Sequence, residues 1–332
     1  MKPRKALLSI TLALLLLAAP LVADAQQPGK IPTIGYLMQQ SAPAGSPSSL
    51  LEAFLEGLRE LGYVEGKNIA IERRYTEGNN ERLPELVAEL ARLKVDIIVV
   101  ETGMAALQAK KVTQTIPIVM TGSSDPVSEG LVASLAHPGG NITGLTSLIL
   151  ASIGKRLKLL AEVVPNLTNV GVLWDGVSSP LSDREWAEMR AAAQPLKVQL
   201  YSLKGRGPAE FPGAFAEAVR QQVQAIIPFD TWAIHAAPAQ IAELVLQNRL
   251  PMISFYMSFP RQGGLMSYGW NPLESFRRAA TYVDRILKGA KPADLPVGQP
   301  AKFVLWINLK TAKAIGLTIP KSVLMQADQV FE

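Results

Sequence analysis

The 332-residue chain contains no cysteine and only two histidines. Without cysteine it can form neither a disulfide framework nor a thiolate metal site, and it has no residue for a lipobox-type lipid anchor. The two imidazoles, His137 and His235, have no partner at metal-ligand spacing. We therefore predict that the protein holds no metal and no cofactor.

Sequence signatures of common enzyme sites are also missing. The chain has no Gly-x-Gly-x-x-Gly fingerprint, no Walker loop and no Gly-x-Ser-x-Gly elbow. Carboxylates are plentiful enough for hydrolysis by a carboxylate pair, but no pattern favours that chemistry. We predict that the protein is not an enzyme and has no catalytic residue; a secreted α/β hydrolase or glycosidase is the less favoured alternative.

The charge is nearly balanced and contains no basic run. The chain has 33 Lys and Arg residues against 28 Asp and Glu residues, and residues 26–332 keep 30 basic and 27 acidic ones. Such a distribution gives no electrostatic footprint for nucleic acid. We therefore predict that no nucleic acid is among the partners.

The first 25 residues have the three-part layout of a secretory signal peptide. A positive start, an apolar run and a small-residue motif follow one another as Lys2, Arg4 and Lys5, then Ala6–Val22, then Ala23-Asp24-Ala25. The apolar run is somewhat short for a permanent membrane anchor. We predict a signal peptide at residues 1–25, cleaved between Ala25 and Gln26, and no second stretch able to cross a bilayer.

After residue 30, short apolar segments alternate with amphipathic ones. Apolar residues in Leu50–Leu61 recur at helical spacing, and Gly62 ends the run. Val95–Val100 is a continuous apolar run, typical of a parallel strand buried on both faces. The alternation predicts an α/β fold with parallel sheets and right-handed crossovers. It also predicts a helix over about Val127–Leu135, closed by a turn at residues 137–141.

A similar order of elements starts again in the second half, at offsets of about 128 to 137 residues. Val223–Phe229 repeats the character of Val95–Val100, for example. The repeat predicts two similar three-layer lobes facing each other, after a signal peptide at 1–25. Lobe 1 covers 31–146 and is completed by about 272–300; lobe 2 covers 147–271 and is completed by about 301–332. Because the tail crosses back, the hinge consists of multiple crossovers.

Ligands of open α/β sheets bind beyond the carboxyl ends of the strands. In this chain those exits are rich in hydroxyls, glycines, carboxylates and aromatic rings. Together with the loop after the first strand, they give the following predicted ligand-binding residues: Ser41, Thr102, Gly103, Gly122, Ser123, Asp125, Asp175, Asp230, Thr231, Tyr256, Tyr268 and Gly269.

The chemistry of these exits suits a zwitterion. Hydroxyls and free N–H groups at helix starts suit a carboxylate, and Asp125, Asp175 and Asp230 suit an ammonium group. Aromatic residues add an apolar wall or a cation–π contact. The alternative is that these Ser, Thr and Asp side chains are ordinary helix N-caps, and that Asp125-Pro126 only starts a helix.

Several motifs resemble those of ABC transporter substrate-binding proteins of the tryptophan/tyrosine-binding-like family. They extend over essentially the whole chain after the signal peptide: Phe54–Tyr63 (FLEGLRELGY), Gly66–Glu72 (GKNIAIE), Arg82–Leu86 (RLPEL), Asp125-Pro126, Pro138–Gly144 (PGGNITG), Gly263–Gly269 (GGLMSYG), Ala279–Asp284 (AATYVD), Ile307–Ala312 (INLKTA) and Gly316–Pro320 (GLTIP).

This resemblance implies a type I periplasmic-binding fold and the solute-binding component of an ABC importer. The expected ligand is a small solute, an amino acid in first place and an aromatic or branched one among amino acids, held between two lobes that close by a hinge. The implied partners are a membrane permease and an ATPase; we expect a monomer that meets the membrane only through the permease. A cysteine-free exported binder points to the periplasm. A ligand sensor for a membrane receptor is the other alternative.

Overall fold

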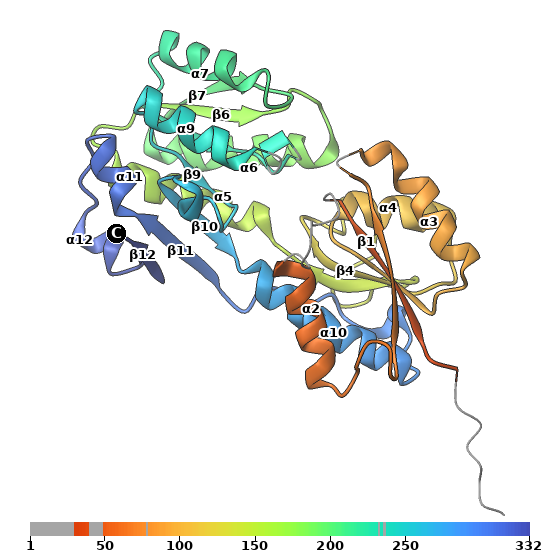
Figure 1. Cartoon of the computed structure of the whole chain (residues 1–332). Helices are drawn as coiled ribbons and strands as arrows, with labels where there is room; N and C mark the ends of the chain where they lie inside the picture. The colour runs from red at the N-terminus through yellow and green to blue at the C-terminus, as the bar shows by residue number, and fades with distance from the viewer. Residues whose placement is uncertain (1–29, 40–48, 78, 232, 235–236) are drawn as a thin grey trace, which may run out of the picture. The chain divides into compact units, whose positions relative to one another are not determined.

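The computed structural model describes residues 30–39, 49–77, 79–231, 233–234 and 237–332. The predicted signal peptide with its cleavage site, and the candidate ligand contact Ser41, lie outside these ranges. Of the described helices, none is both long and apolar enough to cross a membrane. Figure 1 shows the course of the chain and the labels of its elements.

The first sheet has five parallel strands in the order β2-β1-β3-β4-β5. Alternate residues of its central strand face opposite helical layers: Ile97 and Val99 pack on one side, Ile98 and Val100 on the other. This explains the continuous apolar run, because a strand covered on both faces has no polar side. The strands are β1 (Thr33–Met38), β2 (Ala70–Tyr75), β3 (Ile97–Val100), β4 (Ile118–Ser123) and β5 (Ile142–Thr146).

Helices cover both faces of this sheet. On one face α2 (Ser49–Glu60) lies against α10 (Pro272–Leu287), although the two are far apart in the sequence (Figure 1). On the other face the one-turn η1 (Asn80–Arg82) leads into α3 (Leu83–Arg92), which packs beside α4 (Gly103–Val112). The predicted amphipathic run at Leu50–Leu61 is therefore a helix whose apolar side joins this core.

The segment after α10 adds to the edge of the first sheet beyond β5. It contains the short helix η3 (Pro292–Asp294). The Thr143 hydroxyl donates to the Leu295 carbonyl at 2.6 Å, and a parallel bridge joins Leu145 to Gly298. Residues far along the chain thus share hydrogen bonds with the strand that ends the first half.

The second half contains a three-stranded sheet, β7-β6-β8, and a four-stranded sheet, β12-β11-β10-β9. A parallel bridge between Ile226 and Met252 connects them. All paired strands are parallel except β10 and β11, which are antiparallel. The strands are β6 (Asn169–Trp174), β7 (Gln199–Lys204), β8 (Ala225–Pro228), β9 (Ile253–Ser254), β10 (Met266–Trp270), β11 (Phe303–Asn308) and β12 (Gln329–Phe331).

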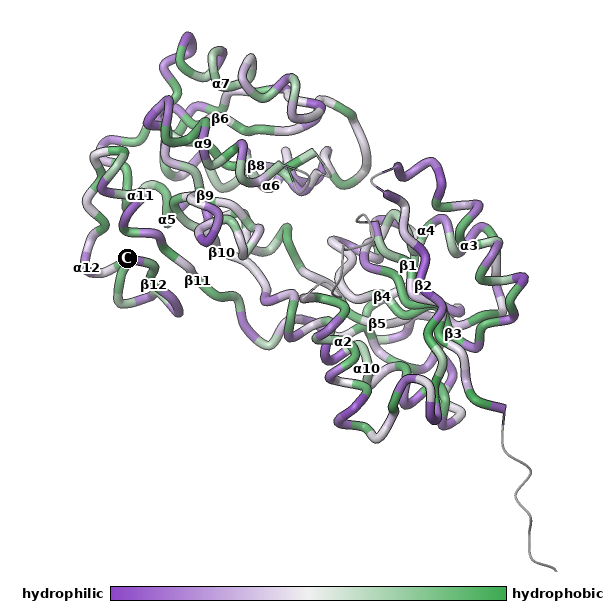
Figure 2. Tube along the Cα trace, in the orientation of Figure 1, coloured by the Kyte–Doolittle hydropathy of each residue, from purple (hydrophilic) through white to green (hydrophobic). Residues whose placement is uncertain are grey.

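Two helical layers also enclose β6 and its neighbours. Val172 faces a core that includes α5 and α6, whereas Leu173 faces a core that includes α7 and α9. Figure 2 shows apolar residues along these buried strands and mixed polarity along the helices. The helices are α5 (Ile149–Val163), α6 (Pro180–Leu196), α7 (Phe211–Arg220), α9 (Pro238–Asn248), η2 (Pro260–Gln262), α11 (Leu309–Ala314) and α12 (Lys321–Leu324).

The predicted helix over Val127–Leu135 is wrong, because this segment forms turns. The Pro126 carbonyl accepts hydrogen bonds from the N–H groups of both Leu131 and Val132, at 2.9 and 3.2 Å. Gly130, directly before Leu131, has a φ of +68°, a left-handed conformation that ends a helix. Strand β5 was not predicted either, because it follows directly on a Pro-Gly-Gly turn.

The contact between α2 and α10 generates a prediction for Gly57→Ala. A Cβ at Gly57 would lie 2.3 Å from the Arg277 carbonyl oxygen, so the helices must separate. We expect the free energy of unfolding to fall by about 1–3 kcal/mol, and Tm in thermal unfolding to fall by roughly 2–6 °C. The matched control is Gly213→Ala in α7, where a Cβ meets nothing within 4 Å. An equal effect of both substitutions would contradict this packing.

Candidate functional site

Glu101 follows β3 and is the first charged side chain at the strand exits. Its carboxylate accepts the N–H of Gln39, which follows β1, at 3.2 Å. The residue is only partly covered, yet desolvation of its carboxyl raises the pKa to about 7. The next residue, Thr102, caps α4: its hydroxyl accepts the Ala105 N–H at 3.2 Å. Thr102 is therefore a helix N-cap in this structure, as the alternative to a ligand contact had it.

Glu129, from the segment that was expected to be helical, reaches back to the exit of β4. Its carboxylate accepts the hydroxyl of Ser123 at 2.9 Å and the N–H of Asp125 at 3.2 Å. It also occupies the space beside Gly103 in the first turn of α4, where a Cβ would lie 1.8 Å from the Glu129 Oε2. Desolvation raises the pKa of Glu129, with a further contribution from Asp230 and Asp125. Gly103 thus makes room for a carboxylate of the chain itself.

Asp230 follows β8 and connects with residues of both halves of the chain. Its N–H donates to the Glu185 carboxylate of α6 at 2.9 Å, and its own carboxylate accepts the Ser124 hydroxyl at 2.5 Å. Arg184, next to Glu185, forms an ion pair with Asp125. The structure therefore brings together Ser123, Asp125 and Asp230 of the predicted site, through partners that the prediction had left out.

Two buried ionisable groups lie behind this exit. Arg156 of α5 is fully buried, and Glu185 is 1% exposed. Burial raises the pKa of Glu185 to about 8, and the neighbouring charges of Asp230 and Asp175 act in the same direction. Burial lowers the pKa of Arg156 to about 10, while Glu185 and Asp230 oppose that shift. Asp230, Asp175 and Glu185 thus place three carboxyl groups within electrostatic reach of one another, beside the cation of Arg156.

Aromatic rings border the acidic cluster. Trp186 lies edge-on to Phe229, with 5.0 Å between the ring centres, and Trp174 is 5.8 Å from Trp186. Trp270 covers Gly122, where a Cβ would lie 2.6 Å from the indole. Because Trp174, Trp186 and Trp270 are only partly buried, their rings can still offer apolar surface.

The remaining predicted residues have varied surroundings. Asp175 accepts the Val177 N–H at 2.9 Å in the turn after β6, close enough to Glu185 to raise its pKa. Tyr268 stacks on Phe303, with 5.7 Å between ring centres. Thr231 is buried, and its hydroxyl has no hydrogen-bond partner among the described residues. The Tyr256 N–H donates to the Ser254 hydroxyl. A Cβ at Gly269 would meet the Phe255 carbonyl.

Sequence reasoning missed Arg156, Glu185 and Glu129. Arg156 carried a usable signal, because it stands three residues after Ile153 and four before Leu160 on the apolar side of α5. A charge at such a position predicts either a buried partner or a functional role. Glu185 had no such signal, since an acidic residue in an amphipathic helix is ordinarily solvated. Among the described residues, no group of three or more His, Asp or Glu side chains could hold a metal ion.

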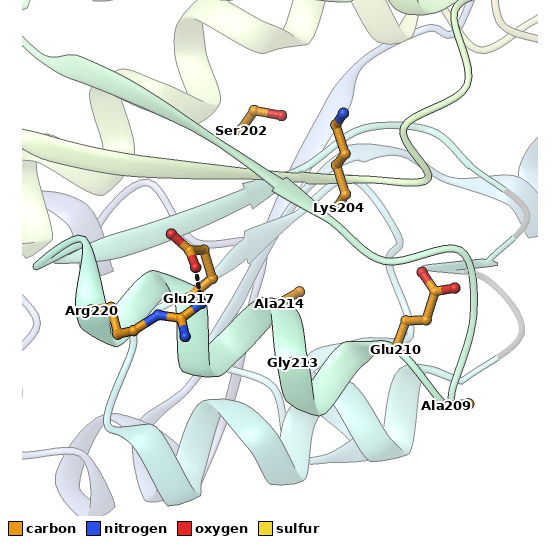
Figure 3. A pocket seen from close by; sticks show the side chains of 8 residues that line it. All are labelled: Ser202, Lys204, Ala209, Glu210, Gly213, Ala214, Glu217 and Arg220. Carbon is orange, nitrogen blue, oxygen red and sulfur yellow. Dashed lines mark hydrogen bonds and ion pairs between the residues drawn. The ribbon is translucent and has the colours of Figure 1, made fainter.

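A cavity of about 470 Å³ lies beside the edge strand β7. Lys204 of β7 and Glu210 of α7's N-cap border it, and Figure 3 shows Glu217 paired with Arg220 along α7. None of the predicted ligand contacts lines it. We therefore do not assign the ligand site to it.

Comparison with known proteins places the chain among transport proteins. A family described as "ABC transporter substrate binding protein" matches residues 45–331. A tyrosine-binding protein of Clostridioides difficile is 25% identical over 269 residues, which cover 80% of this chain and 76% of that protein.

Two solved structures are similar in fold and sequence. A conserved domain protein from Vibrio cholerae superposes with a TM-score of 0.82 at 25% identity, covering 91% of this chain and 100% of that one. An ABC domain in complex with L-Trp from Streptococcus pneumoniae superposes with a TM-score of 0.80 at 25% identity, covering 90% and 99%. The predicted α/β fold with parallel sheets and two lobes is confirmed.

The burial of Glu185 predicts a pH-dependent stability. Because the pKa of Glu185 is raised from 4.5 to about 8 in the folded protein, its contribution to the free energy of unfolding is complete below pH 4.5. That contribution is lost as the pH rises through about 8. In Glu185→Gln this loss cannot occur. Between about pH 5 and pH 8 we expect the free energy of unfolding of the wild type to fall by roughly a few kcal/mol relative to that of the variant. Thermal unfolding should show this as Tm values that diverge with rising pH. The exposed Glu188→Gln on the same helix should follow the wild type; parallel curves for Glu185→Gln would refute the assignment.

Proposed function

Because this chain belongs to the family of ABC transporter substrate-binding proteins, we propose that it captures a free amino acid, with an aromatic one in first place, at the exits of β4, β6 and β8. The chain is a substrate-binding protein and not an enzyme, as the sequence predicted. The amino-acid ligand is the part that we infer, from the chemistry of the site together with the relatives.

The observation that carries the proposal is the gathering of Asp230, Glu185 and Glu129 at neighbouring strand exits. Glu185 and Glu129 have raised pKa values, which means that the surroundings disfavour further negative charge. An ammonium group relieves this, because an opposite charge in a desolvated site stabilises the ionised carboxylates. Asp230 is the group that we assign to it, since its N–H donates to Glu185 and its charge contributes to the raised pKa of both Glu185 and Glu129.

The partly buried indoles supply the second half of the argument. Trp186 neighbours Glu185 in α6, and Trp270 covers Gly122 at the exit of β4. Rings of this kind suit an apolar or aromatic side chain next to the ammonium site. The relative named as tyrosine-binding and the similar structure in complex with L-Trp support an aromatic amino acid as the first candidate.

We propose that the two lobes close over the solute by a hinge. Lobe 1 comprises 31–146 with about 272–300, and lobe 2 comprises 147–271 with about 301–332. A ligand that contacts exits of both lobes binds the closed arrangement better, so binding shifts the population toward it. Tyr256, Thr231 and Ser41, which were predicted from the sequence, are further contacts that we propose for that arrangement.

Substrate-binding proteins of ABC transporters act outside the cytoplasm, bind small solutes and work with the other transporter components. For this chain we propose the periplasm, reached by cleavage between Ala25 and Gln26, with a permease and an ATPase as partners. We further propose that it works as a monomer and meets the membrane only through the permease. Intact-mass measurement of the exported protein tests the first step: the expected N-terminus is Gln26, and retention of residues 1–25 would contradict it.

The ligand proposal is tested by titration calorimetry with L-tyrosine, L-tryptophan and L-leucine. We expect at least one aromatic amino acid to bind, and Asp230→Asn to weaken it about 10- to 100-fold, because a charged hydrogen bond to the ammonium is lost. The exposed Asp294→Asn should bind as the wild type does. The proposal fails if none of the three ligands binds, or if the two variants are weakened equally.

A further inference from the structure

Arg156 is a charged side chain in an apolar layer. It is fully buried on the side of α5 that also carries Ile153, Leu157 and Leu160. Removing a guanidinium from water costs several kcal/mol unless other groups compensate for it. Its retention at this position therefore calls for specific partners.

The partners of Arg156 belong to two strand exits. Its Nη1 donates to the carbonyl of Pro228, the last residue of β8, at 3.3 Å. Its guanidinium also lies over the ring of Phe255, just after β9, 5.6 Å from the ring centre. Nε and Nη2, which form one edge of the guanidinium, have no hydrogen-bond partner among the described residues. Arg156 is thus attached to the β8 exit while keeping its charge largely unneutralised by direct bonds.

Glu185 holds the same exit from α6. Its carboxylate accepts the Asp230 N–H at 2.9 Å, two residues beyond the carbonyl that Arg156 binds. Between these two points, Phe229 is fully buried and packs against Trp186, the neighbour of Glu185. Three consecutive residues, 228–230, are therefore held in turn by the Arg156 guanidinium, a ring contact and the Glu185 carboxyl group.

We propose that Arg156 and Glu185 are positioning residues: from α5 and α6 they fix the β8 exit at residues 228–230 and hold Asp230 where it accepts the ammonium group of the solute. Neither side chain touches the solute. The inference depends on the proposed function only for the identity of the group that Asp230 receives.

The charges around Glu185 give the pair a second consequence. Glu185 faces the cation of Arg156 on α5 and the carboxylates of Asp230 and Asp175 at the exits of β8 and β6. Asp230 in turn faces Glu129, which also feels Asp125. An ammonium group at Asp230 favours the ionised form of Glu185, whose pKa is about 8 in the free protein. Binding then releases a proton, and affinity rises with pH up to about 8.

The test separates position from charge on Glu185. Glu185→Leu removes the acceptor for the Asp230 N–H, whereas Glu185→Gln keeps an acceptor and removes only the charge. In the ligand-free protein we expect faster amide hydrogen exchange over 229–231 in Glu185→Leu and not in Glu185→Gln. With L-tyrosine or L-tryptophan, Glu185→Leu and Arg156→Met should bind about tenfold more weakly, and Arg156→Lys should recover part of the loss.

The pH profile supplies the readout that a merely structural role would leave unchanged. From pH 6 to pH 8 the wild-type affinity should rise by up to about tenfold, and the rise should be smaller in Glu185→Gln but not in the control Glu188→Gln. Thermal unfolding establishes that each variant is folded. If Glu185→Leu keeps wild-type exchange and affinity while Asp230→Asn is weakened, the positioning role is wrong and the proposed function stands. If the wild type binds no amino acid, both are wrong.

Discussion

Parallel pairing of neighbouring strands forces the chain to return to the same end of the sheet after every strand. In this protein the constraint applies to all of the first sheet and to β7-β6-β8. The exits of β3 and β4 therefore lie at one edge, and those of β6 and β8 at another. The strand-exit residues of the candidate site owe their place to that return, whatever their distance along the sequence.

Convergence of the exits also concentrates charge. Glu101, Glu129 and Glu185 each have a raised pKa, and desolvation is the largest cause for all three. A domain that only needed to be stable gains nothing from this, since well-packed apolar residues cost less. The acids are instead suited to a partner of opposite charge that arrives from solution. The buried Arg156 offsets the cluster without cancelling it.

The sequence predicted those parts that depend on local pattern. Val95–Val100 had to be a strand covered on both faces, because no polar residue interrupts it. The strand exits could also be located, because each lies where such an apolar run ends. The network behind them could not, because it depends on side chains whose helical positions do not distinguish a buried acid from a solvated one. Glu185 and the exposed Glu188 lie on the same helix, one turn apart. Glu129 could not be predicted for a second reason: the apolar spacing around Gly130 predicted a helix where the chain forms a turn.

Glycines at strand exits show how one sequence feature can have two physical causes. Gly103 and Gly122 were predicted to be ligand-binding residues. The structure fills both spaces with the chain's own groups, the Glu129 carboxylate and the Trp270 indole. A missing Cβ permits close approach of any group, and sequence alone does not say which. Because Glu129 comes from the turn after β4 and Trp270 from the end of β10, the two glycines let distant segments bring a charge and a ring to the exits of the first sheet. For the proposed site, we expect ligand selectivity at these positions to depend on the groups that occupy the glycine spaces more than on the glycines themselves.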